Sequence, residues 1–157
     1  MAQLDAVFSA ERRRGGIAVK TWGDLGLEGA WANRPLHRYG MVARRASGNP
    51  PGVVNFIQRR VLLDGPFRGD IAEQVDRAGE QALAAIVRRV GEDVDGIGYS
   101  GFGYASGSVR AVPLAEHAGA SFVAGTPESV ADRRYPLGRR IYIMIDRAPG
   151  RPLDPAL

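Results

Sequence analysis

The chain has 157 residues, the size of one domain, and it contains no cysteine and only two histidines. A disulfide scaffold and thiolate chemistry are therefore excluded, and a metal site built from several histidines is not expected. The formal net charge is +4, and Lys20 is the only lysine among the 21 basic residues. Because acidic residues are interspersed among the arginines and there is no lysine-rich tail, the charge pattern does not support a nucleic-acid surface.

No stretch reaches the roughly 18 consecutive apolar residues that a membrane-spanning helix needs. The N-terminus places Asp5 before a short apolar stretch and Arg12–Arg14 after it, which is the reverse of a secretory signal. If the parent protein is exported, we expect this chain to begin after its signal.

Apolar periodicity and turn residues divide the chain into alternating helices and strands. The clearest helix spans residues 80–90, whose apolar side chains recur at the i, i+3, i+4 and i+7 positions of one face. Thr126 followed by Pro127 is typical of a helix start. In chain order we expect a helix over 2–11, a turn-rich segment over 21–35, a strand over 36–43, a helix over 53–63, a strand over 71–75, a helix over 80–90, strands over 96–99 and 109–114, a short helix after Thr126 and a strand over 140–146.

The fold class follows from the most strand-like run, RIYIMID at residues 140–146, which is apolar on both faces. A strand that is buried on both faces needs a layer of structure above and below it. Because strands also alternate with helices along the chain, we expect an α/β fold, a three-layer sandwich with a mixed sheet.

Gly96, Gly98 and Gly101 satisfy the G-x-G-x-x-G pattern of dinucleotide-binding proteins. That fingerprint needs a helix that opens at the third glycine, so that its amides can hold a pyrophosphate. Residues 102–108, FGYASGS, are too rich in glycine and too few for such a helix. We therefore expect two core strands joined by an irregular crossing, and no cofactor.

A strand, a glycine-containing loop and a helix follow one another between residues 36 and 63. The N-terminus of a helix after such a loop presents unpaired amides and the positive end of the helix dipole, so it suits an anion, with Ser47 and Asn49 as side-chain donors. An ordinary capped helix fits the same residues, because Asn or Ser followed by Pro is also a common helix start.

Three segments of the sequence, in this order, resemble the phosphate-binding solute-binding proteins of ABC importers. They are RYGMVARRASGN at 38–49, DGIGYSGFGYASGSVRAVPL at 95–114 and TPESVADRRYPLGRRIYIMIDRAPGRPLDP at 126–155. The third segment is the most specific of the three, and the similarity extends over nearly the whole chain.

The resemblance implies one lobe of a type II periplasmic binding protein, with residues 1–146 as a single α/β lobe and residues 147–157 as a tail or the start of the crossing to another lobe. It implies a substrate-binding component, or an isolated lobe, of a phosphate-type ABC importer. The implied partners are inorganic phosphate or a similar oxyanion, the membrane subunits of the importer and the missing first lobe. The implied location is periplasmic or extracytoplasmic.

The ligand-binding residues that the resemblance implies are Arg44 or Arg45 with Ser47, Gly48 and Asn49. This sequence departs from the family pattern at three places. Ala43 stands at the family's arginine position, and Asn49 stands where the family has a threonine after the loop glycine. Pro50 and Pro51 follow, and neither has a backbone N–H. Without these donors and without the opposite wall of a cleft, the chain alone should bind phosphate weakly.

The alternative to a binding lobe is a structural or interaction module that has lost its ligand and that self-associates as a homo-oligomer or contacts a partner. An enzyme is not expected. No G-x-S-x-G elbow precedes a helix, and neither His37 nor His117 lies in a local pattern that would pair it with a serine such as Ser47 or Ser100. The sequence therefore offers no catalytic residue.

Overall fold

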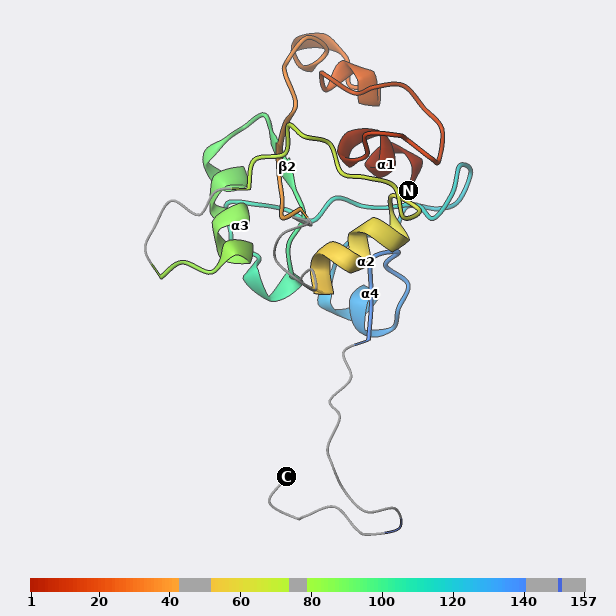
Figure 1. The fold of residues 1–157 in the computed structure, drawn as a ribbon, viewed down its shortest axis with the longest axis vertical. Coiled ribbons are helices and arrows are strands. Elements are labelled where there is room, and N and C mark those ends of the chain that lie inside the picture. The colour runs from red at the N-terminus through yellow and green to blue at the C-terminus, as the bar shows by residue number, and fades with distance from the viewer. Residues whose placement is uncertain (43–51, 74–78, 141–149, 151–157) are drawn as a thin grey trace.

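The computed structural model describes residues 1–42, 52–73, 79–140 and Gly150 (Figure 1). Within these residues the chain folds into short helices, short strands and long irregular connections. The elements are α1 (Ala2–Phe8), the 3-10 helices η1 (Gly23–Leu25) and η2 (Gly29–Trp31), β1 (His37–Tyr39), α2 (Gly52–Arg60), α3 (Ala82–Glu92), β2 (Gly96–Gly98), the 3-10 helix η3 (Phe102–Tyr104) and α4 (Pro127–Ala131). The fold is mixed α/β, as the sequence predicts.

The described sheet consists of β1 and β2, which run parallel with Arg38 opposite Ile97. A parallel bridge between Tyr39 and Ala72 extends the pairing on the far side of β1. α3 packs on this sheet and lies beside β2 in Figure 1. A Cβ atom at Gly98 would lie 2.9 Å from the Cγ2 atom of Ile86 in α3, so only glycine permits this close approach of helix and strand.

The hydrophobic core brings α1, α2 and the end of β2 together. Its central aromatic residue is Tyr99, which follows β2 and is 8% exposed. The ring of Phe8 from α1 meets the Tyr99 ring edge-on at a centroid distance of 5.2 Å, and Phe67 stacks on it at 6.2 Å. Ile57 of α2 and Leu62 just after it complete the same cluster. Burial of these side chains is the main favourable contribution to folding.

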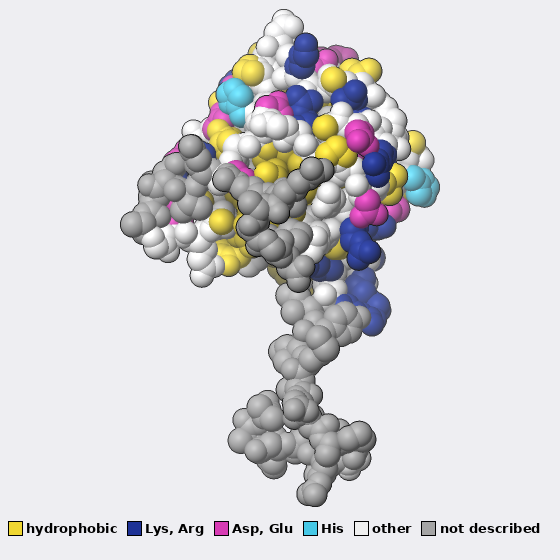
Figure 2. Space-filling model, viewed as in Figure 1, with side chains coloured by type: hydrophobic (Ala, Val, Ile, Leu, Met, Phe, Trp, Pro, Cys, Tyr) yellow, Lys and Arg dark blue, Asp and Glu magenta, His cyan; other side chains and the backbone are white. Residues whose placement is uncertain are grey.

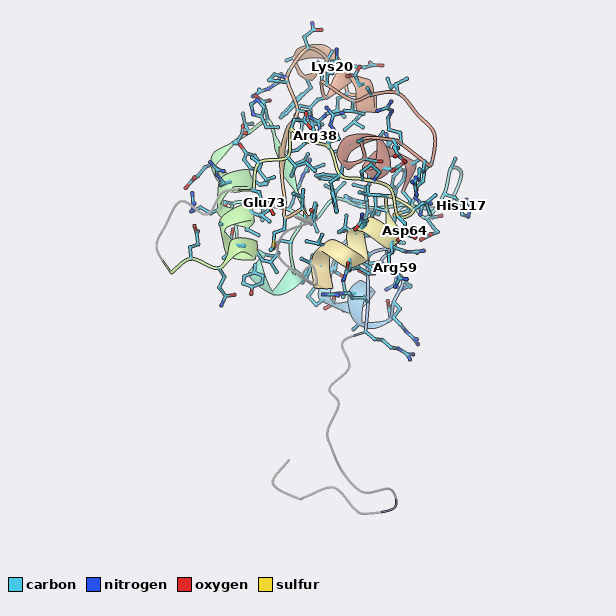
Figure 3. All side chains as sticks on the ribbon, in the orientation of Figure 1. Lys20, Arg38, Arg59, Asp64, Glu73 and His117 are labelled. Carbon is cyan, nitrogen blue, oxygen red and sulfur yellow. The ribbon has the colours of Figure 1, made fainter. Side chains whose placement is uncertain are left out.

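A buried arginine ties three segments of the backbone to this core. Arg38 in β1 is 6% exposed (Figure 3). Its guanidinium donates hydrogen bonds to the carbonyl oxygens of Val7 at 2.7 Å, Leu36 at 3.0 Å and Val19 at 2.5 Å. Asp70 approaches the same group at 3.3 Å. Arg38 therefore satisfies three carbonyl groups for which the described part of the chain provides no strand partner.

The helix predictions are largely confirmed, with bounds that are shorter for α1 and α2 and shifted by two residues for α3. α3 at Ala82–Glu92 matches the helix expected over 80–90, and α2 ends at Arg60 and not at residue 63. α1 ends at Phe8 and not at residue 11, because the extended Ser9 turns its side chain onto the amides of Glu11 and Arg12. α4 begins at Thr126 and Pro127 as expected.

The strand predictions are less accurate. The strand expected over 36–43 is confirmed at His37–Tyr39 alone, and the one expected over 71–75 is a single bridge at Ala72 in the part described. The strand expected over 109–114 is wrong, because these residues form only the bridge from Leu114 to Val123. Of the run 140–146, Arg140 is described and is not in a strand, while residues 141–146 lie outside the described residues.

Candidate anion-binding site

The predicted ligand-binding residues are not among those that the structure describes. Arg44, Arg45, Ser47, Gly48 and Asn49 all lie in the undescribed stretch 43–51, together with Ala43, Pro50 and Pro51. The structure does describe the two residues that flank this stretch, which are Val42 and Gly52. The structure therefore describes the residues that lead into and out of the predicted binding loop.

The chain enters the stretch 43–51 from β1, and its last described residues are held by hydrogen bonds. The Tyr99 hydroxyl donates to the carbonyl oxygen of Met41, and the amide of Val42 donates to the Glu73 carboxylate at 2.9 Å. Burial, with the Glu73 charge as a smaller cause, raises the pKa of Tyr99 well above its usual value. The Tyr99 hydroxyl therefore remains a proton donor at neutral pH.

The chain leaves the stretch at the first residue of α2. The guanidinium of Arg139 donates to the carbonyl oxygen of Gly52 at 3.0 Å, and it lies 5.5 Å from the centroid of the Phe56 ring. Both contacts hold an exposed cationic side chain beside the N-terminus of α2. Arg139 comes from the segment after α4, and its contact with Gly52 spans 87 positions of the sequence.

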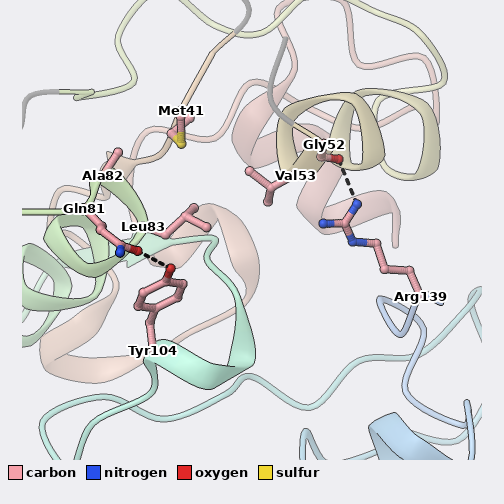
Figure 4. A pocket seen from close by; sticks show the side chains of 8 residues that line it. All are labelled: Met41, Gly52, Val53, Gln81, Ala82, Leu83, Tyr104 and Arg139. Carbon is pink, nitrogen blue, oxygen red and sulfur yellow. Dashed lines mark hydrogen bonds between the residues drawn. The ribbon is translucent and has the colours of Figure 1, made fainter. Parts of the chain in front are cut away.

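A cavity of about 320 Å³ lies between these two ends (Figure 4). Two helix N-termini border it, from α2 on one side and from α3 on the other. In Figure 4 the guanidinium of Arg139 points toward Gly52 on one side of the cavity. On the other side the Tyr104 hydroxyl points toward Gln81 and donates to its side-chain oxygen at 2.5 Å. The lining residues are Met41, Gly52, Val53, Gln81, Ala82, Leu83, Tyr104 and Arg139.

The arrangement is suited to a small anion. Gln81 is the N-cap of α3, and its side chain makes no capping hydrogen bond. The first amides of α2 and α3 have no partner within their own helices, and the positive ends of both helix dipoles favour negative charge nearby. Arg139 adds a full positive charge beside the first residue of α2. The Tyr104 hydroxyl gives its single proton to the Gln81 side chain, so in this arrangement it offers an anion no donor.

Sequence reasoning did not predict that Arg139, Tyr104 and Gln81 border this cavity. The pair Arg139-Arg140 is visible in the sequence, but its spacing gives no reason to place it near residue 52. Tyr104 belongs to the glycine-rich crossing, and its position depends on η3, which begins directly after Gly101. η3 has three residues, so no α-helix opens at Gly101 in the described segment 101–108, as the sequence predicts.

The histidines have no described catalytic partner. The imidazole Nδ1 of His37 lies 2.7 Å from the Asp93 carboxylate, which also accepts a hydrogen bond from Tyr39 at 2.8 Å. Within the described residues, neither His37 nor His117 hydrogen-bonds a serine or threonine. In that same part of the chain no group of three or more His, Cys, Asp or Glu side chains could hold a metal ion.

The surface in Figure 2 carries interspersed acidic and basic side chains, with hydrophobic side chains gathered near the middle of the face shown. Several arginines form ion pairs, such as Arg60 with Glu116 at 2.6 Å and Arg134 with Asp132 at 2.7 Å. Among the helices that the structure describes, none is long and apolar enough to span a membrane.

Comparison with known proteins gives two relatives of high similarity. Both are described as phosphate-binding protein PstS, come from two strains of Pseudomonas aeruginosa and are 39% identical to the chain over 156 residues. The aligned part is 99% of this chain and 45% of each relative, so the chain spans less than half the length of the relatives it matches. No family model matches the chain. The resemblance predicted from the three sequence segments is confirmed, and the chain is a partial-length relative of the phosphate-binding protein PstS.

Proposed function

We propose that the chain is a phosphate-binding lobe of a solute-binding protein that delivers its ligand to an ABC importer, and that it is not an enzyme. The observation that carries this proposal is the 39% identity to the phosphate-binding protein PstS along 99% of the chain. In this proposal residues 1–146 form one α/β lobe, a three-layer sandwich with a mixed sheet, and residues 147–157 lead out of it. The lobe works outside the cytoplasm and meets the importer's membrane subunits.

The anion site in this proposal combines the undescribed loop with the cavity next to it. Ser47, Gly48 and Asn49 supply hydrogen-bond donors, and Arg44 or Arg45 supplies positive charge. Arg139 is added on the strength of its position, since it borders the cavity and contacts Gly52 directly after the loop. In this proposal the positive charge of Arg139 compensates for the arginine that the family has at the position of Ala43.

The affinity for phosphate should be low for the chain by itself. Pro50 and Pro51 have no N–H, so two donors are missing just before α2. Each hydrogen bond to a charged group contributes about 1.5–3 kcal/mol, so two missing donors account for a loss of two or more orders of magnitude. We expect a dissociation constant near the millimolar range, about −4 kcal/mol.

Isothermal titration with inorganic phosphate at low ionic strength tests the proposal, with sulfate as the competing oxyanion. Ser47→Ala and Arg139→Gln should each weaken binding about tenfold or more, because each removes a donor to a charged ligand. Arg134→Gln is the matched control, since Arg134 is exposed, pairs with Asp132 and does not line the cavity.

Equal phosphate affinities of the native chain, Ser47→Ala and Arg139→Gln would contradict the proposed site. The absence of any measurable heat with phosphate in the high millimolar range would contradict phosphate binding by this chain. If Ser47→Ala loses affinity and Arg139→Gln does not, the loop would be supported as part of the site and the role of Arg139 would be contradicted.

A second candidate function is a module that contacts another protein. The observation in its favour is the exposure of large apolar side chains, with Phe122 71% exposed and Val112 46% exposed. Light scattering at increasing protein concentration distinguishes the two functions. Self-association that Phe122→Ser abolishes would support the module, and a monomer at all concentrations would count against self-association.

A further inference from the structure

Residues 99–104, YSGFGY, follow β2 and form part of the glycine-rich crossing, and we call them the YSGFGY segment. η3 and not an α-helix follows Gly101, so the glycine pattern does not serve a pyrophosphate. The segment carries three hydroxyl side chains, at Tyr99, Ser100 and Tyr104. Each of them donates a hydrogen bond to a residue that is at least 17 positions away and that lines the anion cavity.

Two of these hydroxyl groups reach the start of α3. The Ser100 hydroxyl donates to the carbonyl oxygen of Leu83 at 2.8 Å. The Tyr104 hydroxyl donates to the side-chain oxygen of Gln81 at 2.5 Å, as Figure 4 shows. Gln81 is the N-cap of α3, and Leu83 lies in its first turn. The YSGFGY segment is therefore bonded to the end of α3 that carries the positive end of the helix dipole.

The third hydroxyl group reaches the chain just after β1. Tyr99 donates to the carbonyl oxygen of Met41, which borders the cavity. The Tyr99 ring also lies against Gly40, where a Cβ atom would be 2.6 Å from the Cε1 atom of the ring. Because the ring is buried and packs edge-on against Phe8, its own position is fixed by the core. Met41 is thus tied to the core through Tyr99.

We propose that the YSGFGY segment positions the walls of the anion cavity, and that Tyr99, Ser100 and Tyr104 are positioning residues that do not bind the anion themselves. A single short segment that is bonded to both Met41 and the start of α3 fixes the spacing between them. A charged ligand binds well only where its donors are held at the right distances by supporting residues. The inference rests on the proposed function, because positioning is measured by the affinity of the cavity for phosphate.

The test variants remove hydroxyl groups without leaving a backbone group unpaired. Leu83 lies inside α3, so its carbonyl oxygen also accepts the helical hydrogen bond and keeps a partner in Ser100→Ala. Tyr104 is exposed, and Tyr104→Phe keeps its ring. Tyr99 is left unchanged, because Tyr99→Phe would deprive the Met41 carbonyl group of its donor. The double variant Ser100→Ala/Tyr104→Phe should therefore fold with nearly the stability of the native chain.

The first measurement uses no ligand. In the native chain, ¹⁵N relaxation should give order parameters of about 0.85 for the amides of residues 81–83, the value of a rigid backbone. In the double variant we expect them to fall to about 0.6 or lower, because the start of α3 loses two bonds to the YSGFGY segment. Ser106→Ala/Tyr135→Phe is the matched control. Its two hydroxyl groups bond to Ser108 and Val112, outside the anion cavity.

The second measurement is a phosphate titration of the same chains, followed through the amide of Gly52. We expect the double variant to bind phosphate about tenfold more weakly than the native chain, and the control variant to bind it equally well. Ser100→Thr keeps a hydroxyl group and should keep the native affinity. Urea unfolding of each variant separates a change in affinity from a change in the free energy of unfolding.

Order parameters at residues 81–83 that keep their native values in the double variant would overturn the inference, whether or not phosphate binds. Equal phosphate affinities of the native chain and the double variant would also overturn it, as would an equal loss of affinity in Ser100→Thr. A native chain that does not bind phosphate would contradict the proposed function instead. The order parameters alone would then decide whether the YSGFGY segment positions the cavity walls.

Discussion

Single polar residues inside the core decide how the irregular segments of this chain are held. The described strands have three residues each, so few backbone groups are satisfied by strand pairing. Arg38 takes over this role for three carbonyl oxygens, and Tyr99 does the same for the carbonyl oxygen of Met41 at the edge of the anion cavity. The sequence shows that Arg38 lies in a strand, but its burial could not be predicted, because that depends on Val7 and Val19.

Replacement of Arg38 by methionine should destabilise the folded chain by about 3 kcal/mol or more, because buried carbonyl groups lose their donors. Urea unfolding of Arg38→Met and the native chain measures this change in the free energy of unfolding. Arg134→Met is the control, since Arg134 is exposed, and should lie within about 0.5 kcal/mol of the native chain. Equal losses in both variants would contradict the role given to Arg38.

At the scale of elements, helices were predicted better than strands for a physical reason. A helix is specified by its own apolar periodicity and its capping residues. The helix over 80–90 and the helix start at Thr126-Pro127 could therefore be predicted from the local sequence alone. Ser129 completes the α4 cap, because its hydroxyl accepts from the Thr126 amide at 3.0 Å. A strand depends on its partners, and the strand expected over 109–114 has no described partner beyond the bridge at Leu114.

The connection that follows Phe67 carries an ion pair whose strength depends on pH. Arg68 donates to both carboxylate oxygens of Asp70, at 2.8 and 2.7 Å, and Arg38 lies 3.3 Å away. The hydrogen bond from Arg68 is the main cause that lowers the pKa of Asp70, and burial opposes it. Because the pKa is lower in the folded than in the unfolded chain, this stabilisation is complete above about pH 4 and is lost as the pH falls through the folded value.

Asp70→Asn should therefore lower the free energy of unfolding at pH 7 by at most about 1 kcal/mol, because the carboxylate is half exposed. The difference from the native chain should shrink as the pH falls below about 4. Urea unfolding at pH 7 and pH 3 measures it, with Asp64→Asn as the control, since Asp64 is exposed and its nearest cation is 3.8 Å away. A difference that grows on acidification would contradict this account.

For the whole molecule, the sequence was sufficient for the α/β class and for the relationship to PstS, which the identity over 99% of the chain confirms. The cavity could not be predicted in the same way. Its two sides come from segments as far apart as Met41 and Arg139, and only the folded chain brings Arg139 to the first residue of α2. The loop 44–49 lies outside the described residues, so the anion site that combines it with the cavity beside Gly52 stays a proposal.

The most direct test of this account is a phosphate titration followed by nuclear magnetic resonance of the ¹⁵N-labelled chain. The account predicts that phosphate shifts the backbone amides of Ser47, Gly48 and Asn49, together with Gly52 and the guanidinium of Arg139, and that sulfate at equal ionic strength shifts them less. Phosphate-dependent shifts confined to other residues, with the loop and Gly52 unchanged, would contradict the proposed site.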